Sequence, residues 1–505
     1  KKIHSIILFL NFKINFMREF MFKFLNPKQK GYPASLEFRK IPASKITPLI
    51  LCESFNAPVL LESAFLKTGK GRFSILILKE AFRVTQENQK ISLINEDLNH
   101  TFKDSQNFLQ ILETLRNLAP TPQNLPQDLP LPLGGVGYLG YEFFSQIESI
   151  QFKNPSLYDC YDNAFIFGRD FAIFDHFYES LYLISVTYQD ECESHNLNQR
   201  LERIIQKLEN LQPTQESSKN YTSEIISKDK QSYYTHMVTT LKEEIYKGNL
   251  LQCVPSQSMQ IKSNLPPLKA YMNLRTNNPS PYMYYYNFGH FQIIGSSPEV
   301  LIKLESLDEK TAKLTLRPIA GTRKRGMNEI EDSRLEEELI HNEKENAEHL
   351  MLLDLGRNDI GKVAIGGSVK VTQEKVIEKY AKVMHLVSEV EGIMDLQTHK
   401  KDDALLAAFP AGTVSGAPKI QAIKTIESLE EHKRGIYAGA IGYFTQSGDM
   451  NFAIAIRTAI YQNGIYYLQA GAGIVYDSIP KEEYLETKNK MLSLVEAIMG
   501  ENNAK

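Results

Sequence analysis

The strongest constraint on the fold is a set of apolar segments that are short and rich in aromatic and β-branched residues. The segments "IYAGAIGYFT", "NFAIAIRTAIY" and "GIYYLQAGAGIVY" follow one another near the C-terminus, with turn sequences between them. Two more, "GGVGYLGYEFF" and "NAFIFGRDFAIFDHFYESLYLISVTY", lie in the first half. Such segments are typical of strands, and short turns join antiparallel neighbours. Together with helical stretches between them, they predict an α+β fold of large, mostly antiparallel sheets flanked by helices, rather than a Rossmann winding.

The chain of 505 residues is too long for one ordinary hydrophobic core, which favours two subdomains. We expect a tail at 1–32, an N-terminal regulatory domain at 33–211, a linker at 212–228 and a catalytic domain at 229–500. One long helix is expected over 328–356, with Gly356 at its C-terminal end. The first segment, "KKIHSIILFLNF", has no cleavage site and is too short to cross a bilayer, so we expect 1–16 to precede the true start or to form a disordered tail.

The composition favours a globular protein that binds neither nucleic acid nor a membrane. The net charge is −3, from 57 Lys and Arg against 60 Asp and Glu, and the basic residues form no stripe. The four cysteines lie far apart in the sequence, without CxxC spacing: Cys52, Cys160, Cys192 and Cys253. This spacing favours reduced thiols and a cytoplasmic location, with neither a disulfide framework nor a zinc site.

Two helical stretches each carry a pair of glutamates three residues apart. Glu345 and Glu348 lie in "KENAEHLMLLDLGRND", and Glu483 and Glu486 lie in "DSIPKEEYLETKNK". A spacing of three residues places both carboxylates of a pair on one face of a helix. Four such oxygen ligands could bind Mg²⁺, whereas two solvated acidic helices are the alternative that spacing alone leaves open.

Three further features leave two interpretations each. The loops "RPIAGTRKRG", "FPAGTVSGAPK" and "QAGAGIVYDS" either bring backbone N–H groups close to a ligand or are simple turns, and none matches a P-loop. His385 lies among apolar residues and is either a core residue or a functional one. Arg457 lies in an apolar stretch that predicts a strand, so its charge needs a partner, for which a substrate anion is a candidate.

From about Leu60 to the C-terminus, the sequence resembles the chorismate-utilising enzymes, most closely the anthranilate synthase component I family. The resemblance is carried by "LLES", "GYLGYE", "NPSPYM", "GSSPE", "RPIAGTR", "KENAEHLMLLDLGRND", "VMHLVS", "FPAGTVSGAPK", "YAGAIGYF", "AIRT" and "QAGAGIVYDSIPKEEYLETKNK", in that order. So many long motifs in one order favour the functional interpretation of each. Residues 1–32 match nothing in the family.

The resemblance implies a site for each chemical role in converting chorismate to anthranilate. Glu345, Glu348, Glu483 and Glu486 would hold Mg²⁺ against the ring carboxylate of the substrate. Glu299 would be the general acid that protonates the departing C4 hydroxyl, and His385 would serve in the loss of pyruvate. Tyr437, Arg457 and Thr413, the last grouped with the catalytic residues, match positions that contact the enolpyruvyl side chain. The remaining substrate-binding positions are Gly321, Thr322, Gly471, Ala472, Gly473 and Lys490.

Two positions bear on the choice among the chorismate-utilising enzymes. Aminodeoxychorismate synthases commonly carry a nucleophilic lysine where this chain has Ala320, and isochorismate and salicylate synthases carry one where it has Gln252. Without either lysine, ammonia itself is the expected nucleophile at C2. No cysteine of the chain lies in a glycine-rich elbow, so a separate glutamine amidotransferase subunit is expected to supply ammonia, in a hetero-oligomer. An aminodeoxychorismate synthase and a non-catalytic tryptophan-binding regulator remain the alternatives.

The motifs "LLES" and "NPSPYM" match the tryptophan feedback site of the family. Ser63, Pro281, Tyr282 and Met283 are the implied contacts with the inhibitor. The chain contains no tryptophan, which codon bias explains most simply, although a protein made under tryptophan scarcity would show the same absence. One departure from the family pattern is Ser258, which stands where an arginine is usual.

Overall fold

The computed structural model describes residues 33–43, 46–63, 71–95, 99–102, 107–189, 196–211, 220–380 and 383–500. The predicted tail at 1–32 lies outside these ranges, as does the 212–219 part of the predicted linker. Within the described ranges, no helix is long and apolar enough to cross a membrane.

The N-terminal part contains eight strands, three α-helices and one 3₁₀-helix in the described ranges. They are β1 (Ser35–Pro42), α2 (Pro48–Phe55), β2 (Val59–Glu62), β3 (Phe73–Glu87), β4 (Lys90–Ile94), β5 (Asn99–Thr101), α3 (Phe108–Arg116), β6 (Val136–Leu139), η1 (Tyr141–Gln146), β7 (Asn163–Asp175), β8 (Ser180–Thr187) and α4 (Leu197–Glu209). The side chains of Thr47 and Asn107 cap α2 and α3 by accepting hydrogen bonds from Ile50 N–H and Leu109 N–H.

The remaining part alternates strands and helices. Its elements are β9 (Ser223–Ile225), α5 (Gln231–Tyr246), β10 (Gln252–Cys253), β11 (Ser256–Ser263), α6 (Pro267–Asn277), β12 (Tyr282–Asn287), β13 (Gln292–Ser297), β14 (Val300–Ser306), β15 (Thr311–Leu316), β16 (Ile319–Lys324), α7 (Glu329–His341), α8 (Glu343–Gly361), β17 (Lys370–Lys379), β18 (Val383–Asp395), α9 (Asp402–Ala408), η2 (Gly412–Val414), β19 (Gly416–Ala417), α10 (Lys419–Leu429), β20 (Ala440–Phe444), β21 (Met450–Ile454), β22 (Thr458–Gln462), β23 (Ile465–Gly471) and α11 (Pro480–Met499). Strand β9 lies inside the predicted linker and pairs with β11.

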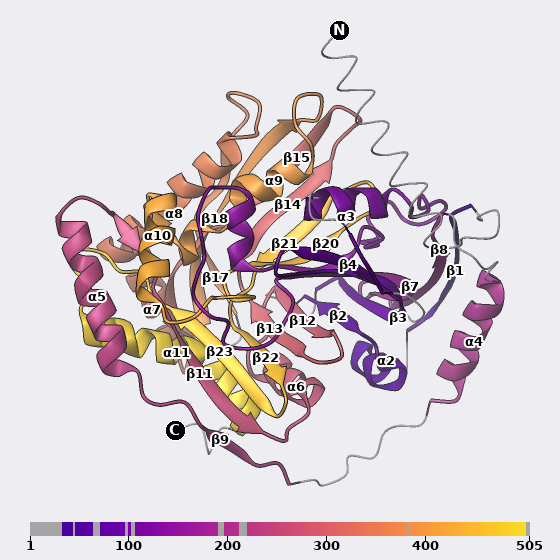
Figure 1. Cartoon of the computed structure of the whole chain (residues 1–505), viewed down its shortest axis with the longest axis horizontal. Helices are drawn as coiled ribbons and strands as arrows, with labels where there is room; N and C mark the ends of the chain where they lie inside the picture. Colours follow the sequence, from indigo (N-terminus) through magenta and orange to yellow (C-terminus); the bar gives the residue numbers. More distant parts are fainter. Residues whose placement is uncertain are drawn as a thin grey trace.

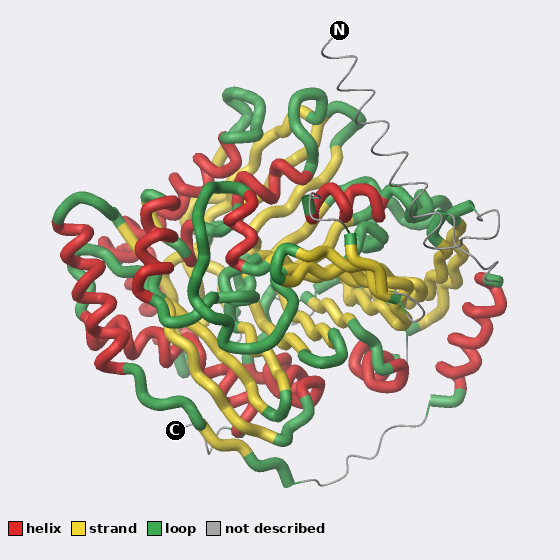
Figure 2. Tube along the Cα trace, viewed as in Figure 1, coloured by secondary structure: helices red, strands yellow, loops and turns green. Residues whose placement is uncertain are grey.

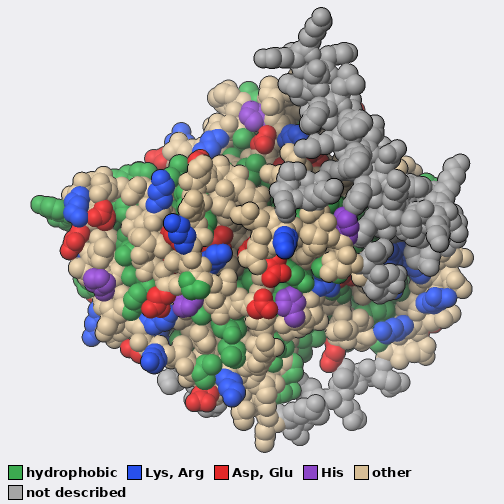
Figure 3. All heavy atoms as spheres, in the orientation of Figure 1, with side chains coloured by type: hydrophobic (Ala, Val, Ile, Leu, Met, Phe, Trp, Pro, Cys, Tyr) green, Lys and Arg blue, Asp and Glu red, His purple; other side chains and the backbone are tan. Residues whose placement is uncertain are grey.

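The strands form a large antiparallel system with helices at its periphery, which confirms the predicted α+β class (Figures 1 and 2). The two parts of the chain are joined by strand pairing, because β2 pairs with β12 and β6 pairs with β20. Helices α5, α7, α8, α10 and α11 gather on the side opposite α4 (Figure 1). On the face seen in Figure 3, basic and acidic side chains of the described residues are interspersed rather than separated by sign.

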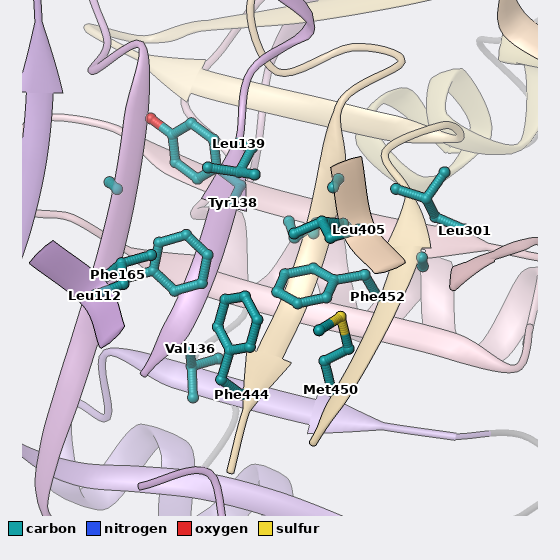
Figure 4. Packing of buried hydrophobic residues seen from close by; sticks show 14 of the residues in the cluster. Leu112, Val136, Tyr138, Leu139, Phe165, Leu301, Leu405, Phe444, Met450 and Phe452 are labelled. Atoms are coloured by element: carbon teal, nitrogen blue, oxygen red, sulfur yellow. The ribbon is translucent and has the colours of Figure 1, made fainter. Parts of the chain in front are cut away.

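The two parts also share one hydrophobic core. Phe165 of β7 has its ring centroid 5.7 Å from that of Phe444 in β20 and 6.1 Å from that of Phe452 in β21. Figure 4 shows these rings beside Leu112 of α3 and Leu405 of α9. Burying a phenylalanine side chain contributes about 2 kcal/mol to folding. Residues 33–211 and 229–500 therefore stabilise each other through shared burial as well as shared strands.

The expectation of a single helix over 328–356 was wrong. The chain forms two helices, α7 and α8, and the break falls at Asn342, whose backbone is extended (φ −70°, ψ 113°). The Asn342 side chain accepts a hydrogen bond from Glu345 N–H at 3.0 Å and so caps a new helix. Gly356 lies inside α8, which continues to Gly361.

Candidate active site

Helix α8 carries the first glutamate pair to the edge of the sheet. The Asn342 cap fixes the first turn of α8, and the carboxyl of Glu345 then lies beside Gly321 of β16. A Cβ built on Gly321 would lie 3.1 Å from Glu345 Oε2. Glu348, one turn later on the same face, lies near the other end of the site, where a Cβ on Gly473 would be 3.7 Å from its Oε1.

Helix α11 carries the second pair. Pro480 opens the helix, and Glu483 is buried in its first turn. Glu486 follows one turn later, and its Oε1 lies 2.6 Å from Lys490 Nζ. Lys490 Nζ also donates a hydrogen bond to the Gly471 carbonyl at 3.0 Å, which ties α11 to the end of β23.

The charges of neighbouring glutamates reach across the two pairs and act on Glu348 and Glu483. Burial raises the pKa of Glu348, and the charges of Glu345 and Glu486 add to this effect against the opposing charge of Lys490. Burial likewise raises the pKa of Glu483, with Glu486 adding to it. For Glu486 burial acts in the same direction, but Lys490, Lys344 and Arg457 together outweigh it and the pKa is lowered.

The donor chemistry of this cluster suits Mg²⁺, which prefers carboxylate oxygens. A divalent cation would also offset the charges of Glu345 and Glu486, which add to the effect of burial on the pKa of Glu348. Within the described ranges, however, no three or more His, Cys, Asp or Glu side chains are gathered tightly enough to hold a metal ion. Two of the carboxylates are instead paired with cations, since Glu345 lies 2.9 Å from Arg323 and Glu486 contacts Lys490.

Glycines allow the backbone to pass close to these carboxylates. Gly321 has a φ of +62° at a bulge in the pairing of β16 with β18, and a side chain there would meet Leu339 Cδ1 at 2.8 Å. At the end of β23, a Cβ on Gly471 would lie 2.6 Å from the Pro255 carbonyl, and one on Gly473 would lie 2.7 Å from Gln252 Nε2. Ala472 lies between them, and its N–H donates to the Tyr234 hydroxyl at 3.1 Å.

His385 lies beside Thr322, as the pairing of β16 with β18 requires. Thr322 Oγ1 and His385 Nδ1 are 2.9 Å apart. Burial, with a contribution from the charge of Arg457, lowers the pKa of His385 to about 4. The imidazole is therefore neutral at pH 7, and a neutral ring has one nitrogen that can accept a hydrogen bond or a proton.

Glu299 has the opposite shift. Burial raises its pKa from an ordinary value of 4.5 to about 8, although Thr413, Arg457 and Lys490 all act to lower it. The Thr413 hydroxyl is buried and makes no well-formed hydrogen bond within the described residues. Both side chains line a cavity of about 40 Å³, which has room for water beside the carboxyl. At neutral pH, Glu299 therefore carries a proton that it can donate.

Arg457 is a cation near Glu299 and Glu486 whose side chain has no fixed partner among the described residues. Among the described residues, its side chain makes no ion pair or hydrogen bond, although the charges of Glu486 and Glu299 and the Tyr437 hydroxyl act on it. The sequence predicted a strand here, which was wrong: Arg457 lies between β21 and β22 with a φ of +51°. The Tyr437 side chain is buried, and its hydroxyl lies against the Gly471 backbone. An unpaired guanidinium beside carboxylates and glycines fits an anionic ligand.

Comparison with known proteins agrees with this arrangement of site residues. Residues 62–496 match the chorismate binding enzyme family. The chain is 40% identical over 476 residues to anthranilate synthase component 1 of Spirochaeta aurantia, covering 92% of this chain and 96% of that protein. It is 39% identical over 461 residues to the component 1 protein of Aquifex aeolicus, covering 89% and 91%. The crystal structure of anthranilate synthase component I from Streptococcus pneumoniae superposes with a TM-score of 0.74 at 37% identity, covering 85% of this chain and 93% of that one.

The chain belongs to the chorismate binding enzyme family. The menaquinone-specific isochorismate synthase of Escherichia coli, at 18% identity and a TM-score of 0.67, shares the fold. The site residues predicted from the sequence can now be sorted by position. One group is linked by the contacts and charge effects described above: the glutamates, the glycines, Ala472, Thr322, His385, Glu299, Thr413, Tyr437, Arg457 and Lys490.

The predicted feedback residues form a second group, where β2 ends and β12 begins. Met283 pairs with Glu62 across these strands, so Ser63 lies one residue beyond that pair. Ser280 N–H donates to the Met283 sulfur at 3.4 Å, which folds the segment containing Pro281 back on itself. The Tyr282 hydroxyl donates to Asn451 Oδ1 of β21 at 3.0 Å. "LLES" and "NPSPYM", over two hundred residues apart in sequence, are thus neighbours in this family member.

Sequence reasoning missed Arg323, Glu430 and Arg434 at the site, whereas it had already singled out Gln252. Arg323 pairs with Glu345 and Glu338, and the cationic loop "GTRKRG" was its only signal. The buried Gln252 Oε1 has no hydrogen-bond partner in the described part of the chain. Glu430 and the buried Arg434 form an ion pair with 2.6 Å between Oε1 and Nη2, behind Tyr437. Ser258, the departure from the family pattern, lies in β11 opposite Gln469.

The raised pKa of Glu299 predicts a pH limit. We expect kcat/KM for chorismate, per concentration of neutral ammonia, to fall as the pH rises through about 8, because the acid then loses its proton. The raised pKa also makes stability depend on pH. The contribution of Glu299 to the free energy of unfolding is greatest below the pKa of the unfolded chain, and it is lost as the pH rises from about 4.5 to about 8. Steady-state rates from pH 6 to about 10 test the predicted fall in kcat/KM.

Glu299→Gln should lose at least about 100-fold in rate, and a Gln variant that retains wild-type activity would exclude the acid role.

Proposed function

We propose that this chain aminates chorismate at C2 with ammonia and then eliminates pyruvate to give anthranilate, the first step of tryptophan biosynthesis, with Mg²⁺ as cofactor. The observation that supports this most directly is the meeting of two glutamate pairs, glycine-rich backbone and an unpaired arginine in a chain 40% identical to an anthranilate synthase component 1.

Glu345, Glu348, Glu483 and Glu486 are the residues that would hold Mg²⁺. When bound, the ion would offset the charge of the ring carboxylate and act as a Lewis acid. For the two paired carboxylates, Arg323 and Lys490 would have to release Glu345 and Glu486. Both cations would remain beside the site and could then meet the carboxylates of the substrate.

The chain's own side chains account for the proton transfers. Glu299, protonated at neutral pH, would give its proton to the departing C4 hydroxyl while ammonia attacks C2. Arg457 and Tyr437 would hold the enolpyruvyl side chain. His385, neutral and oriented by Thr322, would accept the proton lost from C2 as the C3–O bond breaks, and the departing enolpyruvate would take up a proton from solvent to become pyruvate.

Two positions favour ammonia over water or a lysine as nucleophile. Ala320 is buried in β16 next to Gly321, and Gln252 is buried with its amide facing Gly473. Neither side chain can act as an amine nucleophile or as a base for water, whereas neutral ammonia attacks without activation. An aminodeoxychorismate synthase remains the second candidate, and the products of the two reactions differ in the carbon that carries nitrogen.

A separate subunit is proposed as the source of ammonia. Component 1 in the names of the relatives implies a second component. A glutaminase needs a reactive thiolate, but burial raises the pKa of Cys52 and of Cys253 to about 12 and raises that of Cys160 as well. The three cysteines in the described ranges are therefore unsuited to hydrolyse glutamine.

The choice of nitrogen donor tests this function. The purified chain, given chorismate and Mg²⁺, should form fluorescent anthranilate with ammonium and none with glutamine alone. Anthranilate formed from glutamine alone would overturn the proposed division of labour. A chain that binds tryptophan but consumes no chorismate would instead be the non-catalytic regulator.

We further propose that tryptophan inhibits by binding where β2 meets β12. Ser63 could contact a polar group of the ligand, while Pro281 and Met283 could pack against its indole. The glutamates lie on other elements, so inhibition would be allosteric, and tryptophan and chorismate would weaken each other's binding.

Ser63→Phe should fill this site and raise the tryptophan concentration for half-inhibition at least about tenfold, while ammonia-dependent turnover changes less than about twofold. Titrating both proteins with tryptophan under saturating Mg²⁺ checks this. Ser232→Phe, which adds the same ring to the exposed start of α5, is the matched control. Equal inhibition of Ser63→Phe and wild type would show that tryptophan does not bind where β2 meets β12.

A further inference from the structure

Tyr437 is held at the site by a loop that belongs to no helix or strand. Residues 434–437 lie between α10 and β20, and Gly435 has a φ of +58°. Tyr437 N–H donates to the Arg434 carbonyl at 3.2 Å, which closes a tight turn. The position of the Tyr437 ring therefore depends on whatever fixes the backbone of the three residues before it.

The N-terminal part of the chain fixes that backbone. Glu142, in η1, accepts hydrogen bonds from Arg434 N–H at 2.8 Å on Oε1 and from Gly435 N–H at 3.0 Å on Oε2. The neighbouring Tyr141 N–H donates to the Gly435 carbonyl at 2.7 Å. Tyr158 adds two contacts: its hydroxyl accepts from Ile436 N–H and donates to the Arg434 carbonyl, both at 3.2 Å.

These contacts require a carboxylate at position 142 and a close approach of the loop backbone to Tyr158. Two N–H groups converge on the two oxygens of Glu142, and a glutamine would place an amide N–H against one of them. A Cβ on Gly435 would lie 2.8 Å from the Tyr158 hydroxyl, so the loop has no room to shift towards the N-terminal part. The Arg434 side chain is held separately, by Glu430 and by the carbonyls of Val414 and Val254. Glu142 thus controls the backbone of the loop rather than its side-chain anchor.

We propose that Glu142 is a positioning residue for substrate binding, acting through the 434–437 loop on Tyr437. The N-terminal part, expected from the sequence to be regulatory, then also completes the binding site for the substrate. This inference rests on the proposed function only in taking chorismate as the ligand.

The inference predicts coupling between two residues that do not touch each other. Glu142→Gln should lower the affinity for chorismate about tenfold, with the loss in kcat/KM coming mainly from KM, because Tyr437 is displaced and the reacting groups are not. In a Tyr437→Phe background, Glu142→Gln should lower the affinity for chorismate less than about twofold, because the hydroxyl that Glu142 positions is already gone. Glu148→Gln, an exposed acid on the same segment, should change neither quantity.

Calorimetric titration of chorismate in the presence of Mg²⁺, with kcat and KM measured alongside, tests this on the full chain. Equal losses in both backgrounds, or no loss in Glu142→Gln, would overturn the inference in favour of a purely structural role. If Glu142→Gln does not fold, Tyr158→Phe enters the same cycle with the same expectation, since it removes two contacts to the loop. A wild type that binds chorismate without forming anthranilate would refute the proposed function alone. A wild type that binds no chorismate would refute both.

Discussion

Glu348→Ala should abolish chorismate turnover, with a loss of at least about 1,000-fold in kcat/KM. Glu348 belongs to the first glutamate pair and is close enough to the second that burial and the charges of Glu345 and Glu486 raise its pKa. Without it, Mg²⁺ would have one carboxylate ligand fewer, and the charge of the substrate would stay uncompensated. Glu486→Ala should act similarly and would also free Lys490.

The measurement is anthranilate formation from chorismate and ammonium across a Mg²⁺ titration, together with calorimetric binding of Mg²⁺ itself. Glu482→Ala is the matched control, because Glu482 is exposed in the first turn of α11 and adjoins Glu483. It should retain wild-type turnover. Near wild-type activity of Glu348→Ala, or wild-type turnover in the presence of a chelator, would refute the proposed metal site.

His385→Met should stop the reaction after amination and release a non-aromatic aminated intermediate. The imidazole is neutral and its Nδ1 lies 2.9 Å from Thr322 Oγ1, so the proposed role is proton acceptance in the second step. Methionine fills a similar volume but cannot accept the proton. Anthranilate formation should fall at least about 100-fold while chorismate is still consumed.

Mass spectrometry of the reaction mixture distinguishes the possible results. His341→Met, at the exposed end of α7, is the control and should form anthranilate normally. Unreacted chorismate alone would place His385 in the first step, and normal anthranilate formation would remove it from the mechanism.

The sequence predicted which helix faces carry the glutamates better than it predicted the local backbone of the site. The i, i+3 glutamates occupy single faces of α8 and α11 because helical geometry follows directly from spacing. The break at Asn342 was missed because it depends on one side chain satisfying the N–H of Glu345 and so starting a new helix. The left-handed turn at Arg457 was missed because the apolar residues around it continue the strand pattern on both sides.

Long-range pairing was the other limit of prediction. The segments that form β2 and β12 each carry a motif of the family, but nothing in either segment shows that Met283 lies opposite Glu62. The same is true of Glu142, which the motif "GYLGYE" carries without any sign of its contacts to Arg434 and Gly435. Such contacts join segments almost three hundred residues apart, and only the assembled sheet brings them together.

The most direct test of the central claim is where the chain places nitrogen on the ring. Chorismate, Mg²⁺ and ¹⁵N-labelled ammonium should give a product whose nitrogen is bonded to the carbon next to the one that bears the carboxylate, as detected by nitrogen–carbon couplings in the NMR spectrum. That result is anthranilate. A label on the carbon opposite the carboxylate would identify aminodeoxychorismate chemistry instead, and an unlabelled product would contradict amination altogether.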